Sequence, residues 1–224
     1  MNNLVIIILI YLALTNFALS EIFSKNVKIV NQYKVIGQKN FISGYKTFLS
    51  DDIINVVIEI PKSTNEKWEV SKIDGSLEHD FFMGKPRIIE YGPYPFNYGM
   101  IPQTVLPLSV GGDGDPLDVI VIGDKILRGS IIEAKVLGMI DILDMGELDT
   151  KVIAIPKNFS NGSIKDLEDL KLKKPEILEE ILGWFLNYKG KNLITFKGYG
   201  PKTEILEKIK QASKYYKRYG VKPR

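Results

Sequence analysis

Five segments rich in β-branched residues constrain the fold of this chain more than any other feature of its sequence. They occupy residues 55–61, 67–73, 116–123, 130–143 and 150–156, with turn signals between them. Two segments with apolar residues at helical spacing follow, at 175–189 and 202–219. Strands of this length and spacing favour a small barrel over alternating β-α units. We therefore predict a mainly β (α+β) fold with two C-terminal helices packed against a barrel.

Composition narrows the chemistry that the chain can perform. It contains no cysteine, which excludes thiol catalysis, disulfides and zinc-thiolate sites. His79 is the only histidine, so a Ser-His-Asp triad or a two-histidine metal site has almost no residues to use. The formal charge of +3 is modest and the lysines are scattered, which gives no support to nucleic-acid binding. Carboxylates, lysines, arginines and tyrosines are left to carry any catalysis.

The first twenty residues differ from the rest of the chain. Residues 4–14 form an unbroken apolar run, and Ala18 and Ser20 have the small-residue spacing of a signal-peptidase site. We predict an export signal over 1–20, and a periplasmic or secretory protein whose single domain spans 21–224. The alternative is an uncleaved anchor, through which alone the protein would contact a membrane. The apolar run is shorter than the ~20 residues that a spanning helix needs.

An acidic cluster lies directly before the third predicted strand. Asp113, Asp115 and Asp118 fall within six residues, and Gly114 gives the backbone the freedom to bring their carboxylates together. Hard divalent cations such as Mg²⁺ prefer oxygen ligands of this kind. An exposed turn is the simplest alternative. A calcium-binding EF-hand loop is another, but Asp118 stands where that loop requires glycine. The apolar strand that begins at Asp118 favours a metal site.

Strand alternation places further charges on common faces. Lys67 and Glu69 share one face of their strand, because side chains two residues apart point the same way. Asp149 and Lys151 are paired in the same manner, and Glu59 lies on a strand that is otherwise apolar. A buried carboxylate needs a cationic partner or a metal. Ordinary cross-strand salt bridges at the rim of a barrel are the alternative explanation for each pair.

Six short segments together resemble one enzyme family, the family I soluble inorganic pyrophosphatases. They are IEIP at 58–61, K-x-E at 67–69, YPFNYGMIP at 94–102, DGDPLDV at 113–119, D-x-x-x-x-D-x-K at 144–151 and NYKG at 187–190. The resemblance covers about residues 55–215. It implies a five-stranded, OB-like closed barrel with flanking helices, Mg²⁺-dependent hydrolysis of inorganic diphosphate, and self-association into dimers or hexamers. The family is mostly cytoplasmic, which is the alternative to export.

The resemblance also implies roles for individual residues. Asp115 corresponds to the general base beside a metal-bound water. The implied metal ligands are Asp113, Asp118, Asp144, Asp149 and Glu59. The implied substrate-binding residues are Lys67, Glu69, Tyr98, Lys151, Tyr188 and Lys189, with Tyr94 shaping the pocket.

The phosphate-binding arginine departs from the usual pattern. Compact bacterial members place an arginine soon after the glycine that corresponds to Gly75, where this chain has Phe81 and Phe82. We assign the phosphate contact to Arg87, because longer relatives carry a similar G-K-P-R segment. The alternative is that Arg87 caps a surface hairpin.

Two other classes of function are compatible with an acidic cluster. A secreted calcium-binding structural module would use the carboxylates alone, and would not need Lys67, Lys151 and Lys189. A metal-dependent phosphatase or nucleotidase would need a pocket for the organic part of its substrate, and the sequence contains no obvious segment for one.

Overall fold

The computed structural model of this chain describes residues 22–107, 112, 114–159 and 164–221. The predicted leader at 1–20 and the predicted metal ligand Asp113 lie outside the described residues. Among the described helices, none is both long enough and apolar enough to cross a membrane.

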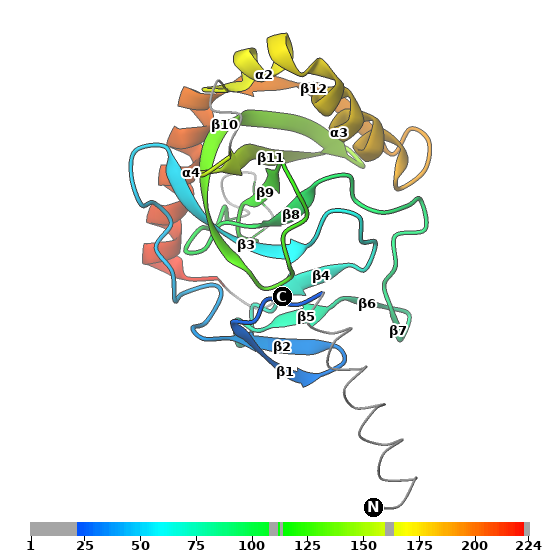
Figure 1. Cartoon of the computed structure of the whole chain (residues 1–224), viewed down its shortest axis with the longest axis vertical. Coiled ribbons are helices and arrows are strands. Elements are labelled where there is room, and N and C mark those ends of the chain that lie inside the picture. The colour runs from blue at the N-terminus through cyan, green and yellow to red at the C-terminus, as the bar shows by residue number, and fades with distance from the viewer. Residues whose placement is uncertain (1–21, 108–111, 113, 160–163, 222–224) are drawn as a thin grey trace, which may run out of the picture.

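A six-stranded sheet forms the centre of the structure (Figure 1). Its strands are β3 (Ile53–Ile60), β8 (Asn97–Met100), β9 (Asp118–Val121), β10 (Ile131–Asp144), β11 (Glu147–Pro156) and β12 (Ile194–Pro201). Their order is β11-β9-β8-β3-β10-β12, and β10 pairs with β11 as well. The pairings therefore run in a ring through β11, β9, β8, β3 and β10. Within this ring β9 and β11 are parallel, and the other pairs are antiparallel.

A smaller antiparallel sheet extends the molecule at the end where the described chain begins (Figure 1). It contains β1 (Val27–Asn31), β2 (Lys34–Gly37), β5 (Leu77–His79) and β4 (Trp68–Val70), in the order β1-β2-β5-β4. A two-stranded hairpin of β6 (Phe81–Phe82) and β7 (Lys85–Pro86) follows β5. Trp68 and Val70 are buried in a core cluster that also contains Phe23. This sheet thus joins the N-terminal segment to the central strands.

Among the described residues, three helices complete the fold, namely α2 (Leu167–Lys173), α3 (Pro175–Asn187) and α4 (Lys202–Tyr219). Asp166 caps α2 by accepting a hydrogen bond from the backbone N–H of Asp169. Pro175 begins α3, where its missing N–H breaks no helical hydrogen bond. The buried residues of α4, which include Ile205 and Ile209, recur every three to four positions and face the sheet.

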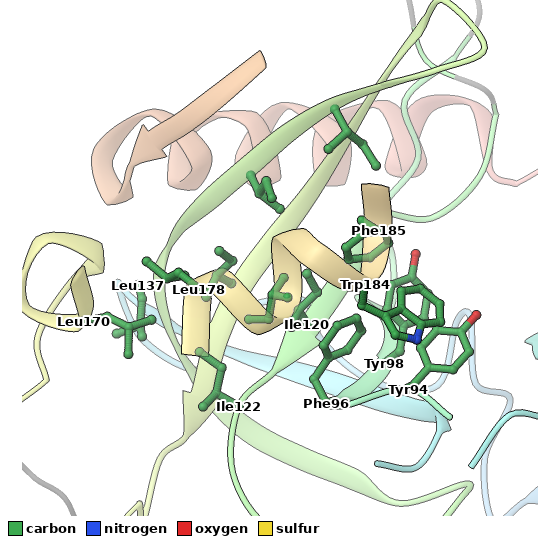
Figure 2. Packing of buried hydrophobic residues seen from close by; sticks show 14 of the residues in the cluster. Tyr94, Phe96, Tyr98, Ile120, Ile122, Leu137, Leu170, Leu178, Trp184 and Phe185 are labelled. Atoms are coloured by element: carbon green, nitrogen blue, oxygen red, sulfur yellow. The ribbon is translucent and has the colours of Figure 1, made fainter. Parts of the chain in front are cut away.

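Two apolar clusters lie on opposite faces of the central strands. Successive residues of β11 alternate between them, since Val152 and Ala154 join the cluster under α4, whereas Ile153 and Ile155 join the cluster under α3. Figure 2 shows the aromatic end of the α3 cluster, where Trp184 packs against Tyr94. Because the side chains of β11 enter these two buried clusters in turn, its residues from Val152 to Ile155 are all apolar.

The mainly β fold with C-terminal helices is confirmed. Each of the five predicted segments contains an observed strand, and α4 has the predicted bounds. Prediction missed α2 and several strands, among them β1, β2 and β12. Their patterns are weak, because β1 is largely exposed and β12 contains two glycines.

The close approach of β8 to β3 generates a test. Gly99 pairs with Ile58, and a Cβ atom at position 99 would lie only 1.8 Å from the carbonyl oxygen of Val57. Because backbone atoms cannot yield as a flexible side chain does, Gly99→Ala is expected to lower the free energy of unfolding by about 3 kcal/mol. Denaturant titration measures this change.

Gly183→Ala is the matched control. Gly183 lies within α3, and a Cβ there would meet no atom within 4 Å apart from its chain neighbours and the backbone of its own helix. Alanine is a better helix former than glycine, so this variant is expected to gain about 0.5–1 kcal/mol. Equal stabilities for the two alanine variants would contradict the account of β3–β8 packing.

Candidate active site

The predicted site residues that the structure describes all line one cavity of about 230 Å³. They are Glu59, Lys67, Glu69, Arg87, Tyr98, Asp115, Asp118, Asp144, Asp149, Lys151, Tyr188 and Lys189. Tyr94 lines it as well. These side chains are therefore brought to one place by six strands, the end of α3 and the loops between them. The strands are β3, β4, β8, β9, β10 and β11.

Strand β4 and the residue before it separate the pocket face from the core face as alternation predicted. Lys67 and Glu69 line the cavity and form an ion pair of 2.9 Å, whereas Trp68 is buried on the other side. Val70 belongs to the same apolar cluster as Trp68 and also borders the cavity. Glu59 reaches the same place from β3, with only 5% of its surface exposed. One of its carboxylate oxygens accepts the backbone N–H of Val70 at 2.7 Å. This bond ties β3 to β4 at the pocket wall.

The parallel pairing of β9 with β11 places Asp118 beside Lys151. Val119 is opposite Val152 in the register, so the residues just before them are neighbours. The Lys151 ammonium lies 2.5 Å from Asp118 Oδ2 and 2.7 Å from Asp149 Oδ1. One buried cation thus bridges two carboxylates from different strands.

Two further ion pairs lie at the ends of the pocket. Lys189, which follows α3, contacts the carboxylate of Asp144 at the end of β10. Lys72 contacts the carboxylate of Asp115. Sequence reasoning missed Lys72, because alternation along β4 assigns it to the core side. The strand ends at Val70, so alternation no longer governs position 72.

An aromatic wall closes one side of the cavity. Trp184 stacks on Tyr188 with ring centres 4.5 Å apart. The ring centre of Tyr94 lies 4.2 Å from that of Trp184, and Figure 2 shows these two side chains together. The ammonium groups of Lys67 and Lys151 each lie 5.6 Å from the centre of the Tyr98 ring. The helical spacing of Trp184 indicated only core packing, yet this side chain also lines the pocket.

Burial and contact with Lys151 shift the pKa values of Asp118 and Asp149 in opposite directions, and burial and its two acidic partners likewise oppose each other on Lys151. Burial alone would raise the pKa of Asp118, but Lys151 and Lys67 outweigh it and hold that pKa below its usual value. Burial raises the pKa of Asp149, although Lys151 opposes the change. The pKa of Lys151 is raised, because Asp118 and Asp149 overcome the effect of its own burial. Asp118 and Lys151 therefore stay charged together.

The tyrosines and Glu59 respond mainly to burial. Burial raises the pKa of Tyr98 well above its ordinary value, with Asp118 adding to the effect. Burial also raises the pKa of Glu59 to about 8, although Lys67 opposes it and Asp118 adds to it. The Tyr98 hydroxyl is thus kept protonated as a donor, and Glu59 holds a proton at neutral pH in the absence of bound cations.

Arg87 forms the contacts of a hairpin cap and also reaches the cavity. Its guanidinium pairs with Asp80 at 2.9 Å, and its backbone N–H donates to the Asp80 carbonyl, so it closes the base of the β6–β7 hairpin. The side chain also lines the cavity. The capping contact and a position in the cavity wall therefore occur in the same residue, and the phosphate contact stays a prediction.

The donor set suits a hard divalent cation. Within the described part of the chain, no three acidic or histidine side chains form a group that could hold a metal ion as they stand, and lysine ammonium groups contact Asp118, Asp144 and Asp149. Asp144 nevertheless has one buried carboxylate oxygen without a hydrogen-bond partner. Carboxylates, with no thiolate and no imidazole in the cavity, are the ligands that Mg²⁺ and similar ions prefer.

Comparison with known proteins gives a consistent result. The model of the inorganic pyrophosphatase family matches residues 56–217. The inorganic pyrophosphatase of Saccharolobus solfataricus is 36% identical over 165 residues, which cover 72% of this chain and 90% of that protein. The inorganic pyrophosphatase of Mus musculus is 37% identical over 63% of this chain, but only 54% of the mouse protein is covered. The chain thus spans most of the Saccharolobus protein and about half of the mouse one.

Solved structures of similar proteins share the fold. Inorganic pyrophosphatase from Schistosoma japonicum superimposes with a TM-score of 0.78 and 29% identity, over 83% of this chain and 75% of that one. Type I inorganic pyrophosphatase from Toxoplasma gondii gives a TM-score of 0.73 and 28% identity, over 86% and 97% of the two chains.

The raised pKa of Glu59 predicts a stability difference that depends on pH. The folded state holds this proton up to about pH 8, whereas a carboxyl with the ordinary pKa of 4.5 has lost it well below that. Metal-free protein therefore loses stability through Glu59 as pH rises between these values, by a few kcal/mol on the scale of about 1.4 kcal/mol per pKa unit. Glu59→Gln keeps the acceptor for Val70 and lacks this loss.

Denaturant titrations in EDTA at pH 5 to 9 measure the difference between the two proteins. We expect the Gln variant to become progressively more stable than the wild type as pH rises. A stability difference between the two proteins that stays constant across this pH range would contradict the claim that Glu59 is buried in its protonated form.

Proposed function

This chain belongs to the inorganic pyrophosphatase family, and from that premise we propose that it hydrolyses inorganic diphosphate to two phosphate ions. The observation that carries the proposal is the convergence of buried and half-buried carboxylates with lysine side chains in one small cavity. Diphosphate is a compact, highly charged anion that needs cations on all sides. A calcium-binding structural module would not need Lys67, Lys151 and Lys189 in the same pocket.

We assign the metal ligands to Asp118, Asp144 and Asp149, with Glu59 and Asp113 contributing, and Mg²⁺ as the ion. A bound Mg²⁺ supplies Lewis acidity and lowers the pKa of a water ligand. The lysines that contact these carboxylates can turn toward a phosphate, since their long, flexible side chains can change rotamer while the backbone stays in place. Asp118 and Asp149 would then exchange an ammonium partner for a metal partner without leaving the pocket.

The remaining residues act on the substrate and on protons. Asp115 accepts the proton of the attacking water, and its ion pair with Lys72 orients its carboxylate. Lys67, Lys151, Lys189 and Arg87 neutralise charge that develops on the departing phosphate. The hydroxyls of Tyr98 and Tyr188 stay protonated because burial raises their pKa, so they can donate hydrogen bonds to phosphate oxygens.

The scaffold and the cellular setting extend the same proposal. The ring of pairings through β11, β9, β8, β3 and β10 supports a five-stranded, OB-like barrel, with β12 added at its side. Self-association into dimers or hexamers follows from family membership and stays a prediction. Export through residues 1–20 is likewise a prediction, which sequencing of the N-terminus of the native protein would test.

A phosphate-release assay separates the proposed activity from that of a general phosphatase or nucleotidase. We expect Mg²⁺-dependent release from diphosphate, with much slower release from ATP and from a phosphomonoester such as glycerol phosphate. Comparable rates on all three substrates would contradict the assignment. Cation binding with no release from any of them would favour the structural module.

Replacement of the proposed base gives a second test. Asp115→Asn should retain metal binding, because the proposed ligands are unchanged, and should reduce kcat by about 10²–10⁴-fold, the usual scale for losing a general base. Asp124→Asn is the control, since Asp124 is exposed and lies outside the cavity. Unchanged turnover in the Asp115 variant would remove the proton-accepting role from this residue.

A further inference from the structure

Arg128 is a fully buried arginine that lies outside the cavity, in the connection between β9 and β10. Burial of a guanidinium is unfavourable unless its charge and its donors find partners. Burial lowers the pKa of Arg128, although Glu66 opposes the change. An arginine held at such a place needs a structural or functional reason.

The contacts of Arg128 lead to the elements that carry pocket residues. Its Nε donates to the backbone carbonyl of Glu59 at 3.0 Å. One terminal nitrogen pairs with Glu66 at 2.7 Å. Its guanidinium carbon lies 4.6 Å from the centre of the Trp68 ring, at a distance typical of a cation–π contact. The same side chain therefore contacts Glu59 on β3 and both neighbours of Lys67.

The segment around Lys67 also holds Arg87 in place. Glu66 forms an isolated bridge with Ile88, and the backbone N–H of Lys67 donates to the carbonyl of Arg87 at 3.0 Å. Through Glu66, Arg128 is thus connected to Ile88 and to the neighbouring Arg87, which lines the pocket.

We propose that Arg128 is a positioning residue, which fixes Glu59 and the Lys67–Glu69 segment relative to each other from behind the pocket. The consequence for turnover rests on the proposed function, but the geometric claim does not. Residues 22–24 complete the arrangement. The backbone N–H of Ser24 donates to the Arg128 carbonyl at 2.8 Å, and the Arg128 N–H donates to the Ile22 carbonyl at 3.0 Å.

Phe23 covers the guanidinium from this N-terminal segment. Its ring centre lies 5.5 Å from the guanidinium carbon, and its ring packs edge-on against Trp68. Phe23 precedes the part of the chain that the family model matches, which begins at residue 56. The N-terminal segment thus excludes water from Arg128, and hydrogen bonds are electrostatically stronger in such surroundings.

The hydrogen bond from Val70 to Glu59 reports on this geometry without any catalysis. It joins the two elements that Arg128 holds, so its amide exchanges with solvent only when they separate. Arg128→Lys keeps the charge but cannot supply the planar fork that serves Glu59 and Glu66 together. We expect amide exchange at Val70 to accelerate by about tenfold or more in the full chain carrying this substitution. The KM for diphosphate should rise more than kcat falls, because Lys67 contacts the substrate.

Ile209→Val is the control for general destabilisation. Ile209 lies on α4 and is buried in a different cluster from Phe23 and Trp68, which contact Arg128. Its shortening weakens the whole domain, so it should accelerate slow amides broadly and leave KM unchanged. Should Arg128→Lys not fold, Glu66→Gln removes one partner from a half-exposed position, and the same effects should appear at smaller size.

Two outcomes separate the positioning role from the function. In the first outcome, the Val70 amide of the Arg128→Lys protein exchanges faster only to the same extent as the other slow amides, as in the Ile209 variant, and KM is unchanged. This outcome would overturn the positioning role of Arg128. Accelerated Val70 exchange together with a wild-type protein that releases no phosphate would support the positioning role and refute the proposed function instead.

Discussion

The contact of one buried lysine with two half-buried carboxylates is the interaction on which the rest of this structure depends. Lys151 is buried and contacts Asp118 and Asp149 at 2.5 and 2.7 Å, while both carboxylates stay partly exposed to the cavity. Burial alone would shift the pKa of each of these groups toward its neutral form. Together Asp118 and Lys151 remain ionised, and they give the pocket the dense, mixed charge that a metal and an anionic substrate require.

The fold serves to bring these charges together from distant parts of the chain. Asp118 begins β9 and Lys151 lies on β11, and the parallel pairing of these strands sets them side by side. The close approach at Gly99, the aromatic wall around Trp184, and Arg128 behind β3 and β4 each hold a different side of the pocket. The N-terminal segment supports the side that carries Lys67 and Glu69.

Period-two alternation predicted much of the site, since it places Lys67 and Glu69 opposite Trp68, and pairs Asp149 with Lys151. Family motifs identified other pocket residues, but not their partners. Lys72 follows the end of a strand, where alternation no longer applies. Arg128 was missed for a different reason, because an arginine next to a glycine usually indicates an exposed turn. Its burial depends on Phe23 and Glu66, which only the tertiary structure brings to it. Short or exposed strands such as β1 lack a burial pattern altogether.

Anomalous diffraction from crystals soaked in Mn²⁺, a hard cation that can substitute for Mg²⁺, tests the central claim most directly. We expect manganese peaks between the carboxylates of Asp118 and Asp149, with the Lys151 ammonium displaced from them toward the centre of the cavity. Manganese bound elsewhere on the protein, with the contacts of Lys151 to both carboxylates intact, would contradict the account.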